Sequence, residues 1–240
     1  MPIARLVCCY WVYLCLAGVF LVTEVDPIKQ ASPQLLHSAY TALAYAGTLA
    51  GYSYVHQALA NPLFTRYLQH LLHYELAAAP MLADTAAALQ QLATVPDEKS
   101  LLQLTQNGSQ QLLPGILATA EQRLAAGQGI DALCFTVAAW LRFSMGFDAK
   151  GDTLQVVDPL AERLMQIRLQ YWDHIDELVA QYLLVAPLFS ATLRSSEVFC
   201  ERLTYWLSYI LANGVVTALQ TLVLEVQDYS AAPRLAGGQV

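Results

Sequence analysis

Two residues three positions apart, His37 and Tyr40, are the polar pair with the best spacing for chemistry in this sequence. On a helix this spacing places both side chains on one face. An imidazole and a phenol on that face can donate hydrogen bonds to a substrate hydroxyl or carbonyl. The alternative is structural, because His and Tyr often pack inside a domain with their polar tips satisfied.

A separate candidate is Arg142, whose guanidinium can hold a carboxylate or a phosphate through two parallel hydrogen bonds. It could instead pair with an acid of the same chain, such as Asp158, and we favour that structural pairing. His70, His73 and Glu75 suggest a zinc site, but no further ligand follows at a recognisable spacing. We therefore expect a solvated helix face there, and no metal site.

The elements that carry these residues are predicted to be helices. Ser32-Pro33 is a typical helix start, with a capping side chain before a proline at the first helical position, and the apolar pattern continues to about residue 60. Asp158-Pro159 opens a later helix in the same way. The remaining helices are expected at 62–76, 84–93, 98–105, 111–126, 130–145, 173–184 and 196–224. No Gly-rich turn follows a predicted strand, so the fold is expected to be all-α with no Rossmann half in this chain.

Composition restricts the partners. Apolar residues make up 56% of the chain and charged residues 13%, which indicates surface that a second domain or a membrane covers. A net charge of −7 with three lysines argues against a nucleic-acid partner. The apolar run at 6–22 could insert into a membrane, but it is shorter than a typical span of about 20 residues. The five cysteines include no CxxC pair and suggest buried thiols in a reducing compartment, so we expect a cytoplasmic protein.

Several short motifs occur in the order found in one known family. The segment LLHSAYTALAY at 35–45, followed by LAGY at 49–52, resembles the start of the C-terminal domain of mannitol dehydrogenases and fructuronate reductases, which typically reads LLNGSHSALAY and then LAGY. NGSQQL at 107–112 is similar to the family's DGSQKL. AAWLRF at 138–143 and DPL at 158–160 are similar to its A-x-W-x-R-Y and DPL.

The resemblance implies a multi-helix C-terminal dehydrogenase domain over 18–224, with an unmatched apolar segment at 1–17 and a flexible tail at 225–240. Family members oxidise a sugar alcohol, or reduce the matching keto sugar or sugar acid, by hydride exchange with NAD or NADP. Their active site lies between this domain and a nucleotide-binding domain. The resemblance therefore implies NAD or NADP as cofactor, with the nucleotide-binding domain on another chain.

The family's catalytic pattern, K-x-x-x-x-N-x-x-H, supplies a lysine base together with an Asn and a His that donate to the reacting oxygen. Carried over without a gap, these positions are Ser32, His37 and Tyr40 here. The family's lysine in DGSQK, which looks like a substrate-anchoring charge, falls on Gln111. Lys29 lies three residues before Ser32, in the connector rather than on the helix. No catalytic residue is therefore assigned.

The candidate substrate-binding residues are His37, Tyr40, Gln111 and Arg142. Two functions stay open. In the first, the chain is an oxidoreductase-family domain that is degenerate or depends on a separate nucleotide-binding chain. In the second, it is a non-catalytic helical binding or structural protein, which could be attached to a membrane through residues 6–22.

Overall fold

The computed structural model of the chain describes residues 33–76, 82–94, 100–148, 150–185 and 188–231. All of them belong to Ala31–Val240, one of the two units into which the chain divides. Several parts of the chain singled out above lie outside the described residues: Lys29, Ser32, the segment at 1–17, the apolar run at 6–22 and the first three cysteines.

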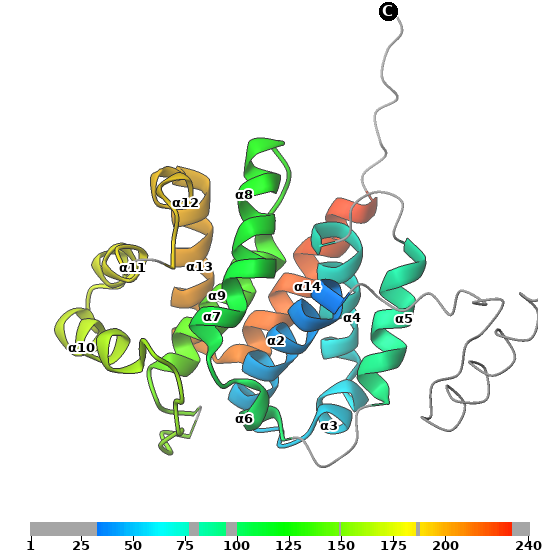
Figure 1. Cartoon of the computed structure of the whole chain (residues 1–240), viewed down its shortest axis with the longest axis horizontal. Helices are drawn as coiled ribbons and strands as arrows, with labels where there is room; N and C mark the ends of the chain where they lie inside the picture. The colour runs from blue at the N-terminus through cyan, green and yellow to red at the C-terminus, as the bar shows by residue number, and fades with distance from the viewer. Residues whose placement is uncertain (1–32, 77–81, 95–99, 149, 186–187, 232–240) are drawn as a thin grey trace, which may run out of the picture. The chain divides into compact units, whose positions relative to one another are not determined.

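The described residues fold as helices, with two isolated β-bridges, Tyr54–Ser100 and Phe147–Thr153, and no strand among them (Figure 1). This confirms the all-α prediction. In chain order the helices are α2 (Pro33–Leu49), α3 (Val55–Ala60), α4 (Pro62–His70), the π-helix η1 (Leu71–Leu76), α5 (Leu82–Ala93), α6 (Leu101–Leu104), α7 (Gly108–Leu112), the π-helix η2 (Leu113–Leu117), α8 (Ala118–Ala125), α9 (Asp131–Ser144), α10 (Ala161–Tyr171), α11 (Ile175–Leu183), α12 (Ala191–Ser195), α13 (Glu197–Asn213) and α14 (Val215–Ala231).

Helices α2 and α9 form the centre of this unit. In α9 only Asp131 and Arg142 are partly exposed, and α2 is buried along its whole C-terminal half. A helix that is apolar nearly all round must be covered on all sides. Accordingly α9 packs on both α2 and α13 and lies between them in Figure 1. Much of the apolar composition therefore lies in α9 and in the C-terminal half of α2, which are buried.

Two expected long helices are each divided at a glycine. The helix predicted to run from Pro33 to about residue 60 ends at Leu49, and the one predicted over 196–224 is two helices, α13 and α14. Gly51 has φ +86° and Gly214 has φ +80°, a left-handed conformation that glycine adopts without steric penalty. The apolar periodicity continues through both glycines, so periodicity alone missed these breaks. Helix α14 also continues past the expected boundary at 224, to Ala231.

The start of α9 is capped by a carboxylate from a distant segment. Glu75 in η1 is 4% exposed, and its two carboxylate oxygens accept hydrogen bonds from the amides of Ala132 (2.9 Å) and Leu133 (2.8 Å). The first amides of a helix have no intrahelical partner and favour an anion. The solvated helix face that we expected at His70–Glu75 is therefore wrong: Glu75 is a buried helix cap, and His70 Nε2 lies 3.4 Å from its Oε1.

Candidate functional site

The first turns of α2 present His37 and Tyr40 as predicted, on one flank of the helix. His37 is exposed and Tyr40 is half-buried. Within the described residues neither side chain has a hydrogen-bond partner. Partial burial raises the pKa of the Tyr40 phenol, which therefore stays a protonated donor near neutral pH. The structural interpretation as a core pair is wrong for His37, because its imidazole faces solvent.

Gln111 lies beside the same helix because two glycines bring α7 and η2 against α2. A β-carbon at Gly108 would collide with the Tyr45 hydroxyl, and one at Gly115 would collide with the Ser38 hydroxyl. These two contacts make the segments antiparallel, with Gln111 between them. The Gln111 side chain turns back toward the residues before α7, where its Nε2 donates to the carbonyl of Gln106 at 2.6 Å.

Arg142 lies elsewhere. It lines one pocket together with Leu49, at the far end of α2 from His37. At about 1.5 Å per residue, Leu49 and His37 are roughly 18 Å apart along the helix axis. The structure thus brings Gln111 alongside the α2 residues, whereas Arg142 belongs to a different region.

The guanidinium of Arg142 is hydrogen-bonded to the loop that follows α9. Nη1 and Nη2 donate to the carbonyls of Phe147 (2.5 Å) and Asp148 (3.0 Å). The expected pairing with Asp158 is not formed. Asp158 instead accepts hydrogen bonds from the amides of Ser109 (2.7 Å) and Leu160 (2.8 Å), which ties the start of α7 to the loop before α10. The predicted helix start at Asp158-Pro159 is wrong, because α10 begins at Ala161 and its N-cap residue, Leu160, makes no side-chain cap hydrogen bond.

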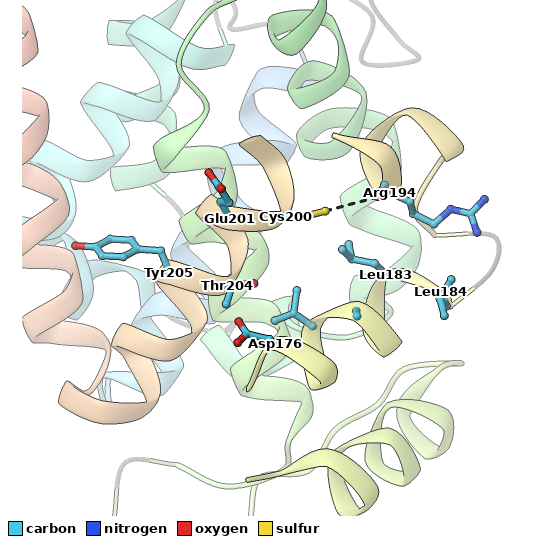
Figure 2. Close-up of a pocket in the computed structure, with 10 residues that line it drawn as sticks. Asp176, Leu183, Leu184, Arg194, Cys200, Glu201, Thr204 and Tyr205 are labelled. Carbon is cyan, nitrogen blue, oxygen red and sulfur yellow. Dashed lines mark hydrogen bonds between the residues drawn. The ribbon is translucent and has the colours of Figure 1, made fainter. Parts of the chain in front are cut away.

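A separate pocket of about 700 Å³ lies between α11, α12 and α13 (Figure 2). Its lining is mostly apolar and includes Asp176, Glu201, Arg194 and Cys200. It contains no lysine or histidine that could take a proton from an alcohol.

The Cys200 thiol in this pocket is a testable reactive group, because it is half-buried whereas the Cys134 thiol is fully buried. Burial raises the Cys200 pKa above its usual 9.0, and the thiolate is the reactive form. We expect iodoacetamide to label Cys200 at least tenfold faster than Cys134, at a rate that still rises with pH above 9. Site-resolved mass spectrometry measures both rates. A Cys200 rate that levels off below pH 8.5 would contradict the raised pKa.

The described residues contain neither a candidate metal cluster nor a candidate membrane span. No group of three His, Cys, Asp or Glu side chains there could hold a metal ion. No helix in the described ranges is long and apolar enough to cross a bilayer. The run at 6–22, on which the membrane alternative depends, lies outside those ranges.

Comparison with known proteins gives a consistent result. Residues 24–211 match the family model of the mannitol dehydrogenase C-terminal domain. The chain is 26% identical over 221 residues to a mannitol dehydrogenase of Saccharomyces cerevisiae, covering 88% of this chain and 43% of that protein. It is 26% identical over 214 residues to a mannitol 2-dehydrogenase of Aspergillus fumigatus, covering 84% and 41%.

A solved structure shares the fold. The mannitol 2-dehydrogenase of Pseudomonas fluorescens, in a ternary complex with NAD and D-mannitol, superimposes with a TM-score of 0.74 at 24% identity, covering 88% of this chain and 43% of that one. Substrate-free D-sorbitol dehydrogenase gives a TM-score of 0.66 at 18% identity, with 86% and 43% covered.

The fold and these similarities define a helical domain of the class found at the C-terminal end of mannitol dehydrogenases. More narrowly, the chain belongs to the mannitol dehydrogenase C-terminal domain family. It spans less than half the length of the relatives that it matches.

Proposed function

We propose that this chain is a degenerate substrate-side domain, which binds a sugar alcohol or the matching keto sugar on the α2 face and does not by itself carry out hydride transfer. The observation behind the proposal is the pair on α2. An exposed His37 and a half-buried Tyr40, both without a partner among the described residues, stand where the family pattern has Asn and His. Both can donate hydrogen bonds to a hydroxyl or carbonyl oxygen, so binding is retained.

Hydride transfer requires a general base in addition to the hydrogen-bond donors that suffice for binding. The reacting alcohol must lose a proton to a base of tuned pKa, and a missing general base alone reduces the rate by about 100- to 10 000-fold. The family lysine position is Ser32, and Gln111 is a neutral amide where the family has a second lysine. Neither residue can supply the base or the substrate-anchoring charge.

NAD, which the family implies, does not fit the described residues. A dinucleotide is held where a Gly-rich turn joins a strand to the N-terminus of a helix. The described part of the chain is helical apart from two isolated β-bridges. Cofactor binding would therefore require a second, nucleotide-binding domain, and we assign no step through NAD to these residues.

The test separates a degenerate domain from one that depends on a partner chain. The purified chain is mixed with NAD⁺ and D-mannitol, with and without the separately expressed nucleotide-binding half of the Aspergillus fumigatus relative, and NADH is followed at 340 nm. We expect no turnover in either mixture. We also expect D-mannitol or D-fructose to bind the chain in calorimetry, and Tyr40→Phe to weaken that binding at least threefold.

A triple variant, S32K with H37N and Y40H, is the positive control. Restored turnover in the triple variant with the added half would support loss of function through these three positions. Turnover by the unmodified chain with the added half would show that it is a partner-dependent enzyme, and the degenerate interpretation would be abandoned.

A further inference from the structure

Three cationic side chains converge on one pocket at the end of α9. Arg142, Lys150 and Arg168 line a cavity of about 390 Å³, within the range of small-molecule sites. The chain has only 12 basic residues and a net charge of −7, so three of them in one cavity is a strong local concentration. None of the three forms an ion pair with a described residue.

The single carboxylate of the lining, Asp148, offsets only one of these three charges. Asp148 Oδ1 accepts hydrogen bonds from the backbone amides of Lys150 (2.8 Å) and Asp152 (2.9 Å), so this carboxylate closes its own loop. The pocket therefore carries two net positive charges. Burial lowers the pKa of Arg142, the charge of Arg168 lowers it further, and the Asp148 carboxylate opposes both effects.

The donors are positioned rather than freely mobile. Arg168 Nη1 is anchored to the Met145 carbonyl at 3.3 Å, and its guanidinium carbon lies 4.8 Å from the centre of the Phe147 ring. No described residue accepts from its remaining nitrogens. A guanidinium held this way can present two parallel donors to an anion.

The remaining lining is apolar and includes a large exposed ring. Trp172, which ends α10, is 71% exposed, and Leu178 and Leu211 complete that side of the pocket. Exposed indole beside cations suits a ligand that has both an anionic group and a flat or apolar face. Two net positive charges match a phosphate monoester, which carries about −1.5 to −2 at pH 7, better than a single carboxylate.

We propose that the pocket lined by Arg142, Lys150, Arg168 and Trp172 binds a small phosphate monoester, whose phosphate contacts the three cations and whose ring packs on Trp172. This site is distinct from the α2 face because Arg142 lies near Leu49, at the other end of that helix. It does not depend on the proposed polyol function.

Calorimetry on the whole chain at low salt tests the proposal, with D-glucose 6-phosphate, inorganic phosphate and D-glucose as probes. We expect the sugar phosphate to bind at least tenfold more tightly than inorganic phosphate, and D-glucose not to bind here. Arg168→Gln should weaken sugar phosphate binding at least tenfold and Lys150→Gln several-fold. Trp172→Leu should reduce the advantage of the sugar phosphate over inorganic phosphate.

The matched control is Arg163→Gln, an exposed arginine on the same helix that does not line the pocket. Its affinity should stay within twofold of the unmodified chain. No binding of either phosphate at 10 mM (a concentration on the order of the weakest useful affinity) would overturn the site. Equal losses in Arg168→Gln and Arg163→Gln would show a general charge effect and would also overturn it. Equal binding of inorganic phosphate and sugar phosphate would overturn the role of Trp172.

Discussion

Replacement of Gly108 by alanine is expected to lower the free energy of unfolding by about 4 kcal/mol, because overpacking costs roughly 1–3 kcal/mol and a buried carbonyl left without its donor roughly 1–3 more. The new β-carbon would collide with the Tyr45 hydroxyl and would lie 2.7 Å from Trp140 Nε1. Both rings are buried in the core. Moving Tyr45 would break its 2.9 Å hydrogen bond to the Thr105 carbonyl. Urea denaturation followed by circular dichroism measures the loss.

A second substitution tests this cause. Tyr45→Phe removes the colliding oxygen, so Gly108→Ala combined with Tyr45→Phe should lose less than the two single variants added together. Gly129→Ala is the matched control, since an added β-carbon there meets nothing within 4 Å. Strict additivity of Gly108→Ala and Tyr45→Phe, or a comparable loss in Gly129→Ala, would contradict this account of the contact between α7 and α2.

Glu75→Gln is expected to destabilise the domain by about 3 kcal/mol, since each hydrogen bond to a charged group contributes roughly 1.5–3 kcal/mol. The two carboxylate oxygens serve the amides of Ala132 and Leu133 at once. An amide side chain keeps one acceptor and turns a donor toward the other N–H. Because α9 is the central helix, we expect the loss as a shift of the whole cooperative transition, measured by thermal and urea unfolding.

The control is Glu162→Gln, an exposed acid in the first turn of α10. Salt screens interactions between exposed charges far more than buried ones. The Glu75→Gln deficit should therefore be similar in low salt and in 1 M NaCl, a concentration at which screening acts over about 3 Å, whereas Glu162→Gln should be close to neutral in both. If the two variants lose the same stability, Glu75 acts only through its charge and not as a specific cap.

Local patterns in the sequence predicted most of the helices of the fold. The apolar period and the capping residues predicted helices at nearly every place where the described residues have them, and the core helix over 130–145 coincides with α9 (Asp131–Ser144). These signals are short-range, because a cap or a helical face is defined within a few residues. The breaks at Gly51 and Gly214 were missed because a glycine within an apolar run is compatible with either a helix or a turn until φ is known.

Local patterns also identified some residues of the candidate site and missed others. The pair His37 and Tyr40 could be found from its spacing on one helix, and the family resemblance indicated Gln111. Glu75 was interpreted as solvent-exposed because its partners, the amides of Ala132 and Leu133, lie more than fifty residues away in sequence. No local pattern marks an acid that caps a distant helix.

The sequence by itself therefore determined the helical class and the family, since each depends on residue type and local order. Tertiary structure decided which polar groups share a site. It separated Arg142 from His37 by the length of α2, and it gathered Arg142, Lys150, Arg168 and Trp172 around one pocket. The physical reason is that both results depend on how α9, α10 and the loop after Gly146 pack together, and these long-range contacts have no periodic signature along the chain.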